Sequence, residues 1–389
     1  MVPRILVIAG SDSGGGAGIQ ADIKTITMLG GHAMTAVTAI TAQNTLGVQA
    51  VHPIPTAMVL AQIDSVLSDI GADAVKIGMI GSAETAHAVA ERLGGLDVPI
   101  VFDPVMVATS GSVLADAATI AAFERLMGMA ALITPNAPEL AAVTGVAVED
   151  EAGLGRAAQA LAKRIGGHVL AKGGHLPGER LPDLLVTPEG VVHRWESTRI
   201  DTVHAHGTGC TLASAIAVHV ARRRPLAEAV ERARGFVRRA MLAAPGLGAG
   251  HGPMGHGEAG GDETNLNQVT LPAADYEVSV AFYRALGLRQ IVDAPGRYAR
   301  FECPGGATLS IHVEQSADAG GAAVYLESGA LDAWVRQLIA AGIAFDALPQ
   351  DQSWGWREAH LRDPAGNRLI LYHGAENRRF PPWRIKDED

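Results

Sequence analysis

The chain contains the sequence His206-Gly207-Thr208-Gly209-Cys210-Thr211, which leads directly into the small, mostly apolar run Leu212–Val218. The two glycines allow a tight turn whose N–H groups point one way, and the helix predicted to follow adds the positive end of its dipole. This pattern predicts an anion hole. Cys210 lies at its mouth, where a helix N-terminus favours a thiolate. Many purely structural turns share the Gly-Thr-Gly pattern, so its meaning depends on the rest of the chain.

Upstream of this turn, apolar runs alternate with segments of helical periodicity. Strands are expected at Ile5–Ala9, His32–Thr41, Ala74–Ile77, Ile100–Phe102, Ala131–Thr134 and His168–Lys172, and helices at Ile19–Leu29, Ala57–Ser68, Ala83–Leu93, Ala117–Leu126, Pro138–Val143 and Gly153–Ile165. This alternation predicts an α/β fold with a mostly parallel sheet and helices on both faces. Ligands of such sheets bind at the carboxyl ends of the strands.

Polar and glycine residues follow four of the expected strands. They lie in Lys76–Gly81, Asp103–Met106, Thr134–Glu139 and Lys172–His175. Taken singly, Asp103 could form only a turn, Asn136 only a helix cap and Lys172 only a solvated strand end. Because all four segments share one edge of the sheet with the Gly-Thr-Gly-Cys turn, we predict a common site there.

A glycine-rich turn, Gly10–Gly18, follows the first expected strand. It superficially suggests a dinucleotide site, but the spacing fits poorly and no acidic residue closes a second strand about 20 residues later. A loop that lets a small ligand approach the backbone closely is the better interpretation. Asp22 and Gln43 are then the expected polar groups of the pocket.

Composition limits the classes of function. The 389 residues carry a net charge of −10 with scattered basic residues, which argues against nucleic-acid binding. Two cysteines, Cys210 and Cys303, make no disulfide framework, so we expect a reducing, cytoplasmic location. The apolar run Ile5–Ala9 is too short for a signal peptide, and no later run is long enough to cross a membrane.

Several motifs in combination resemble the hydroxymethylpyrimidine/phosphomethylpyrimidine kinases of thiamine biosynthesis, members of the ribokinase superfamily. The resemblance covers roughly residues 3–257, with a closing segment at Gly250–Pro253. Its motifs are Ala9–Thr25, Thr41–Thr45, Lys76–Met79, Asp103–Met106, Thr134–Glu139, Lys172–His175 and His206–Thr211.

The resemblance implies that ATP and Mg²⁺ are used to phosphorylate 4-amino-5-hydroxymethyl-2-methylpyrimidine and then its monophosphate, and that the chain forms a homodimer. It also implies roles for residues. Asp22 and Gln43 would read the aminopyrimidine edge, and the residues around the ring would be Gly10, Met79, Val105 and Val107. Asp103 and Glu139 would hold Mg²⁺, and the residues facing the nucleotide would be Asn136, Lys172 and Thr208. The transferred phosphoryl group would be held by the amides of Gly207, Thr208, Gly209 and Cys210.

Cys210 stands where most ribokinase-like sugar kinases have an aspartate base. We hypothesise that its thiolate removes the hydroxymethyl proton in the first transfer. Two alternatives to this activity stay open. One is a pyridoxal- or pyridoxine-type vitamin kinase on the same scaffold, and the other is a ligand-binding regulator without catalysis.

Eight glycines in the sixteen residues Gly246–Gly261 indicate a segment too flexible to pack. His251 and His256 within it could suggest a metal tract, but a terminal loop plus linker is the simpler interpretation. We expect a kinase domain at 1–257, a linker at 258–265, a second domain at 266–375 and a tail at 376–389.

The second domain shows two βαβββ patterns about 55 residues apart. With Ala281–Leu288 and Arg362–Asn367 it resembles the glyoxalase/bleomycin-resistance/extradiol-dioxygenase superfamily. The positions that hold a metal in metal-dependent members correspond to Gln268, Ser310, Ala322 and Ile370, of which alanine and isoleucine cannot ligate. The neighbours that could substitute are His312, Glu314, His360 and His373. We expect a metal-free concave pocket lined by Trp354, Trp356 and Tyr372, unless these aromatics form core.

Overall fold

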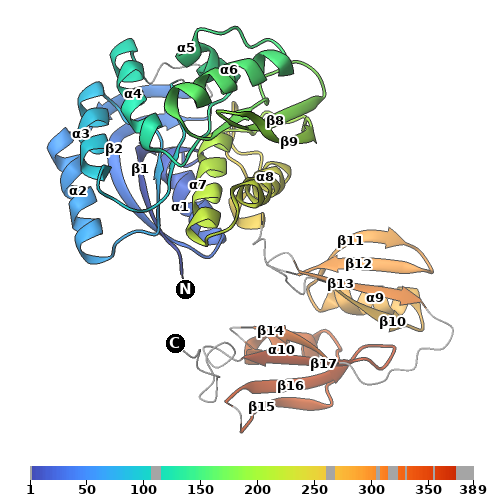
Figure 1. Cartoon of the computed structure of the whole chain (residues 1–389). Coiled ribbons are helices and arrows are strands. Elements are labelled where there is room, and N and C mark those ends of the chain that lie inside the picture. Colours follow the sequence, from blue (N-terminus) through green and yellow to red (C-terminus); the bar gives the residue numbers. More distant parts are fainter. Residues whose placement is uncertain are drawn as a thin grey trace. The chain divides into compact units, whose positions relative to one another are not determined.

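The computed structural model describes residues 2–106, 115–259, 268–303, 307–313, 323–328, 331–353 and 355–373. The chain divides into two compact units, Met1–Glu263 and Thr264–Asp389 (Figure 1). Val107, Glu314, Ala322, Trp354, most of the expected linker and the tail from 376 lie outside the described residues. No helix in the described ranges is both long and apolar enough to cross a membrane.

The first unit is built on one sheet of nine described strands, in the order β3-β2-β1-β4-β5-β6-β7-β8-β9. Strands β2, β1, β4, β5, β6 and β7 are parallel, whereas β3, β8 and β9 pair antiparallel at the two edges. The strands are β1 Arg4–Asp12, β2 His32–Asn44, β3 Gly47–Pro53, β4 Ala74–Ile77, β5 Ile100–Phe102, β6 Leu132–Ile133, β7 Val169–Lys172, β8 Arg180–Thr187 and β9 Gly190–Thr198.

Helices cover both faces of this sheet (Figure 1). They are α1 Gly18–Met28, α2 Thr56–Asp69, α3 Ala83–Leu93, α4 Ala117–Met129, α5 Ala137–Thr144, α6 Glu151–Ile165, α7 Thr208–Ala221 and α8 Leu226–Leu242, followed by a 3-10 turn η1 His256–Glu258. Successive residues of β1 enter two separate cores, because side chains alternate along a strand. Leu6 and Ile8 pack with α2 to α6, while Ile5 and Val7 pack with α1, α7 and α8.

The predicted α/β class with a mostly parallel sheet is confirmed. The sequence did not predict β3, β8 or β9. Most of β3 is exposed, so it lacks the apolar alternation that marks a half-buried strand. Pro182 lies within β8, where a proline argues against a strand, and polar residues dominate β9, as an edge strand tolerates.

The glycine run before the expected linker is packed, contrary to its predicted flexibility. A Cβ atom at Gly250 would lie 2.2 Å from Thr45 O, and one at Gly252 would lie 2.3 Å from His204 Nδ1. His251 N donates to Thr45 O, and His206 N donates to Gly252 O. Residues 246–253 therefore run between the tip of the β2–β3 hairpin and the segment that opens α7, where only glycine permits such close approach.

The second unit contains two four-stranded sheets among its described residues, in the orders β10-β13-β12-β11 and β14-β17-β16-β15. The first has β10 Gln268–Ala273, α9 Tyr276–Ala285, β11 Arg289–Ala294, β12 Tyr298–Glu302 and β13 Thr308–Val313; the second has β14 Ala323–Glu327, α10 Leu331–Ala340, β15 Ala347–Asp351, β16 Arg357–Arg362 and β17 Arg368–His373. Ile343 N closes the turn after α10 on Leu338 O, and the next strand begins at Ala347.

One core joins the two repeats of this unit. Tyr283 Oη donates to Asp363 Oδ2 at 2.8 Å, and Asn367 Nδ2 donates to Pro272 O at the same distance. Tyr283 comes from the first motif of the expected resemblance, and Asp363 and Asn367 come from the second. These motifs therefore hold the repeats together.

Candidate active site

Helix α7 begins at Thr208, and Gly207 caps it with a φ of +86°. A Cβ atom at Gly207 would lie 1.9 Å from Gly16 O, so the turn needs glycine for both its conformation and its space. The first amides of a helix have no partner within it. The amides of Gly209 and Cys210 are therefore donors for an anion at the positive end of the dipole. We call the turn at Gly207–Cys210 the cradle.

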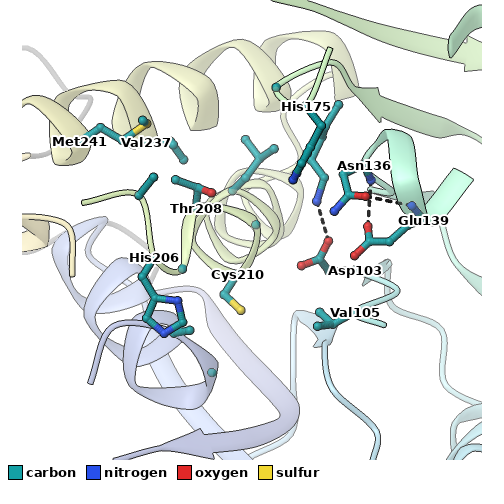
Figure 2. Close-up of a pocket in the computed structure, with 18 of the residues that line it drawn as sticks. Asp103, Val105, Asn136, Glu139, His175, His206, Thr208, Cys210, Val237 and Met241 are labelled. Carbon is teal, nitrogen blue, oxygen red and sulfur yellow. Dashed lines mark hydrogen bonds and ion pairs between the residues drawn. The ribbon is translucent and has the colours of Figure 1, made fainter. Parts of the chain in front are cut away.

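A cavity of about 640 Å³ opens at the carboxyl ends of the parallel strands, in front of this turn. Figure 2 shows the Cys210 sulfur pointing into the space between His206 on one side and Asp103 and Val105 on the other. The predicted site residues that line the cavity are Gly10, Gln43, Met79, Asp103, Val105, Asn136, Glu139, Lys172, Gly207, Thr208, Gly209 and Cys210.

Asp103 connects the cradle to a lysine. Its Oδ1 accepts hydrogen bonds from Lys172 Nζ and Thr134 Oγ1, each at 2.9 Å. A Cβ atom at Gly209 would lie 3.1 Å from Asp103 Oδ2 and 3.4 Å from Lys172 Nζ. Burial alone lowers the pKa of the Lys172 ammonium, but the charges of Asp103 and Glu139 outweigh it and raise that pKa. Lys172 therefore stays charged beside the cradle.

Asn136 and Glu139 form a capping box at the start of α5 (Figure 2). Asn136 Oδ1 accepts from Glu139 N at 2.9 Å, and Glu139 Oε2 accepts from Asn136 N at 2.8 Å. Burial raises the pKa of the Glu139 carboxyl to about 7, with Lys172 opposing this shift and Asp103 adding to it. Asn136 is thus a helix cap that also lines the cavity.

Asp103 and Glu139 suit Mg²⁺ in the chemistry of their donor atoms. Both are buried carboxylates at the cavity wall. Mg²⁺ prefers oxygen ligands and commonly takes only one or two carboxylates, with water and substrate phosphates completing its shell. Among the described residues, no cluster of three or more His, Cys, Asp or Glu side chains could ligate a metal.

Residues 12–255 match the model of the phosphomethylpyrimidine kinase family, which is more than half of the chain. The chain belongs to this family. Residues 265–371 match the glyoxalase/bleomycin resistance protein/dioxygenase superfamily. Both matches confirm the resemblances inferred from the motifs.

Relatives with curated names agree with this family. The chain is 48% identical over 262 residues to a hydroxymethylpyrimidine/phosphomethylpyrimidine kinase of Streptomyces coelicolor, covering 67% of this chain and 96% of the relative. It is 47% identical over 254 residues to the thiamine biosynthesis bifunctional protein ThiED of Geobacter sulfurreducens, covering 65% of this chain. The chain spans only about half of that relative, 52% of its length.

Solved structures of vitamin kinases share the fold of the first unit. A Bacillus subtilis pyridoxal kinase with ADP is 32% identical, with a TM-score of 0.61, and the match covers 66% of this chain and 98% of that one. A phosphomethylpyrimidine kinase from Clostridium difficile 630 is 37% identical, with a TM-score of 0.54, and covers 62% and 99%. A pyridoxal kinase from Staphylococcus aureus was solved with AMP-PCP.

In this member of the phosphomethylpyrimidine kinase family, Cys210 is not the thiolate that its helix position predicted. Burial raises the pKa of the Cys210 thiol to about 11; Lys76 opposes this shift, while Asp22 and Asp103 add to it. The helix end therefore does not make the thiolate the main form of Cys210 at neutral pH, because burial and two nearby carboxylates outweigh it. Cys210 is a thiol at neutral pH.

Asp22 does not line the cavity, contrary to its predicted role in reading the pyrimidine edge. Its fully buried carboxylate accepts from Lys76 Nζ at 2.9 Å on both oxygens and from Ser214 Oγ at 2.7 Å. Burial raises the pKa of Asp22, although Lys76 and Ser214 oppose it. Because these partners occupy the carboxylate, Asp22 ties α1 to β4 and α7 behind the site.

Sequence reasoning gave no role to Asp12, Thr41 or His206, yet all three line the cavity. Asp12 accepts from the amides of Gly14, Gly16 and Ala17 at 2.8–3.0 Å and from His206 Nε2 at 3.1 Å. The sequence carries one sign of this arrangement, because an aspartate before three glycines favours a turn in which its carboxylate accepts backbone amides.

In the glyoxalase-like unit, one described position of the expected metal set, Ile370, has no side-chain donor atom. Ser310 Oγ is 2.7 Å from Thr270 Oγ1, and Ile370 lies on β17 opposite His360. The side chain of Gln268 lies outside the described residues. On the second sheet Trp356 stacks on Tyr372 with ring centroids 4.6 Å apart, and Tyr325 meets both rings edge-on.

The two histidines of the glycine run do not gather as a metal tract. His256 Nε2 is 2.8 Å from Thr211 Oγ1 in a buried contact, and His251 Nδ1 is 3.2 Å from Val203 O. Burial lowers the pKa of His256 to about 4. His256 is therefore neutral at physiological pH, and it anchors the end of the first unit to α7.

Proposed function

We propose that the first unit transfers the γ-phosphoryl group of ATP to the hydroxyl of 4-amino-5-hydroxymethyl-2-methylpyrimidine, and then a second phosphoryl group to the resulting monophosphate. The observation that carries the proposal is the single cavity that contains the cradle of α7, the Lys172–Asp103 pair and Gln43. A phosphoryl donor and a small polar acceptor can meet in such a space.

In each transfer an acceptor oxygen forms a bond to the γ-phosphorus while the bond to the bridging oxygen breaks and ADP leaves. The amides of Gly209 and Cys210 and the Lys172 ammonium face the charge that develops on the moving group, which is the main source of catalysis in such reactions. In the first transfer the hydroxyl proton passes to the thiolate form of Cys210, which is the minor form at neutral pH and arises when the thiol loses its proton to solvent. Mg²⁺ held by Asp103 and Glu139 would supply further positive charge at the phosphates.

Glutamine at position 139 should weaken the binding of this ion without disturbing the helix cap. Glu139→Gln keeps an oxygen that can accept from Asn136 N but removes a negative charge from the cavity. We expect the Mg²⁺ concentration at half-maximal rate to rise by about 10-fold, as is typical when a ligand sphere is weakened. Steady-state rates measured over a Mg²⁺ series test this. Glu124→Gln, an exposed substitution on α4, should leave the Mg²⁺ requirement unchanged.

A substrate panel tests the proposed function directly. ADP release and product formation should be measured with the hydroxymethylpyrimidine, its monophosphate, pyridoxal and pyridoxine. We expect kcat/KM for the pyrimidine to exceed that for pyridoxal by about 100-fold or more, which corresponds to roughly 2.7 kcal/mol. The pyridoxal-type alternative, favoured by the TM-score of 0.61, requires the reverse order. No ADP release with any acceptor would favour a non-catalytic regulator.

We further propose that the glyoxalase-like unit binds a small molecule without a metal. The ring of Tyr325 supports this, because it is 49% exposed beside Trp356 and Tyr372 and aromatic faces stack on flat heterocycles. Calorimetric titration of the chelator-treated full chain with pyrimidine and thiazole compounds tests it. A binding heat lost in Trp356→Ala and kept in Gln43→Ala would place the ligand in this unit, whereas the absence of any such heat contradicts the proposal.

We also propose that the chain forms a homodimer, acts in the cytoplasm and has no nucleic-acid partner. Sedimentation equilibrium of the full chain tests the dimer, with a single monomeric species as the contrary result.

A further inference from the structure

The side chain of Gln43 lies between two groups whose hydrogen-bonding roles are fixed by their other partners. Gln43 Nε2 is 2.9 Å from His206 Nε2, and Gln43 Oε1 is 3.3 Å from Thr41 Oγ1. The backbone of Gln43 is fixed as well, because its N donates to Ser13 Oγ and its O accepts from the same hydroxyl. The remaining freedom is a turn of the amide by 180°, which exchanges oxygen and nitrogen in nearly the same space.

Asp12 determines which ring nitrogen of His206 carries the proton. The Asp12 carboxylate is nearly fully buried. Burial alone raises its pKa, but the hydrogen bonds from His206, Ala17 and Gly14 outweigh it and lower that pKa. An ionised carboxylate can only accept hydrogen bonds. His206 Nε2, 3.1 Å from Asp12 Oδ2, must therefore carry a hydrogen and act as a donor.

Thr41 is constrained from the other side. Its hydroxyl donates to Ser11 O at 2.9 Å, the shorter of its two contacts. A hydroxyl has one hydrogen, and a carbonyl oxygen can only accept. Thr41 Oγ1 is thus left as an acceptor toward Gln43. On the other side, the protonated His206 Nε2 has no lone pair, and its single hydrogen is shared between Asp12 Oδ2 and the Gln43 amide, so an oxygen is favoured there.

We propose that Asp12–His206 and Ser11–Thr41 lock the Gln43 amide in the orientation turned by 180° from the one given above, with its carbonyl oxygen toward His206 and its amino group toward Thr41. One lone pair of the oxygen and one hydrogen of the nitrogen then remain for a ligand. This inference rests on the proposed function, and it makes Asp12, Thr41 and His206 positioning residues that determine specificity.

The locked amide offers an acceptor and a donor side by side. A 4-aminopyrimidine presents the complementary pair, an amino donor next to a ring-nitrogen acceptor. The 4-oxo analogue presents the reverse, a carbonyl acceptor next to an N–H donor, so the lock should reject it. Rejection of this kind is strong because a mismatched pair leaves polar groups unsatisfied in the site.

The decisive measurement is the ratio of kcat/KM for the 4-amino substrate to that for its 4-oxo analogue. In His206→Ala and in Thr41→Val the amide can turn, and we expect this ratio to fall by about tenfold or more, chiefly through KM, with the KM for ATP unchanged. His206→Gln can donate from the same place and should restore most of the ratio. Thr25→Val, a buried threonine on α1 that donates to Ala21 O, is the matched control and should keep it.

A second readout does not depend on activity. Nitrogen-15 NMR of the full chain should find a hydrogen on Nε2 of His206, and a ring protonated only at Nδ1 would overturn the lock. An unchanged amino-to-oxo ratio in folded His206→Ala and Thr41→Val would also overturn it, while leaving the kinase proposal intact. If the unsubstituted chain phosphorylates neither pyrimidine, both proposals fall, and the NMR result then concerns the hydrogen bonds alone.

Discussion

Replacing Cys210 by alanine is expected to slow the first phosphoryl transfer by about 10²- to 10⁴-fold and the second by less than about threefold, the range for losing one proton acceptor. The first acceptor is an alcohol, whose proton must leave as the new bond forms. The second acceptor is a phosphate with a second pKa near about 6, so it is already largely ionised at neutral pH. Each transfer should be measured separately, with the alcohol or the monophosphate as acceptor.

The same hypothesis gives a pH dependence with a definite sign. Burial raises the pKa of the Cys210 thiol to about 11, so the deprotonated fraction grows with pH throughout the neutral range. The kcat/KM of the first transfer should therefore rise by about tenfold per pH unit between about pH 7 and 9, and this rise should disappear in Cys210→Ala. Cys303→Ala, in the second unit, is the matched control. Equal losses in both transfers, or a flat profile, would show that Cys210 serves only the structure of the cradle.

Alanine at position 209 is expected to lower both transfers together by about 10²- to 10³-fold, the loss typical of a disturbed oxyanion site. The added Cβ would lie 3.1 Å from Asp103 Oδ2 and 3.4 Å from Lys172 Nζ, so a methyl group would enter the gap between the cradle and this ion pair. A phosphoryl group has to occupy the same gap in either reaction. The loss should therefore not depend on the acceptor.

Gly128→Ala is the control for Gly209→Ala. Gly128 lies in α4, where an added Cβ meets nothing within 4 Å. It should leave both rates unchanged and slightly stabilise the helix, by up to about 1 kcal/mol. If Gly209→Ala keeps its melting temperature and both rates, the phosphoryl group does not pass through this gap.

The sequence was sufficient to predict which segments meet at the site. Asp103 and Asn136 follow parallel strands and Lys172 ends one, and parallel strands end at one edge of a sheet whatever their exact bounds. Gly207 and Gly209 were informative for a similar reason, because a tight turn before a helix has few other solutions. These inferences rest on local sequence patterns, and the folded structure keeps the local geometry that those patterns predict.

The sequence could not predict the charge states and pairings that arise between distant segments. A helix N-terminus alone favours a Cys210 thiolate, but burial and the nearby Asp22 and Asp103 reverse the outcome. Asp22 itself pairs with Lys76, 54 residues away. Asp12 and His206 are 194 residues apart, so their contact exists only once β1 and α7 are packed. Such contacts depend on tertiary distances, which no local pattern contains.

The packed glycines at 248, 250 and 252 have a consequence for dividing the two units experimentally. Although this segment resembles a flexible linker in sequence, it holds the β2–β3 hairpin, which carries Gln43, against the residues just before α7. A shortened kinase should therefore be cut beyond Ala259, retaining the His256 contact with Thr211, and not at the first glycine of the run. Fusion partners or affinity tags belong after the same point.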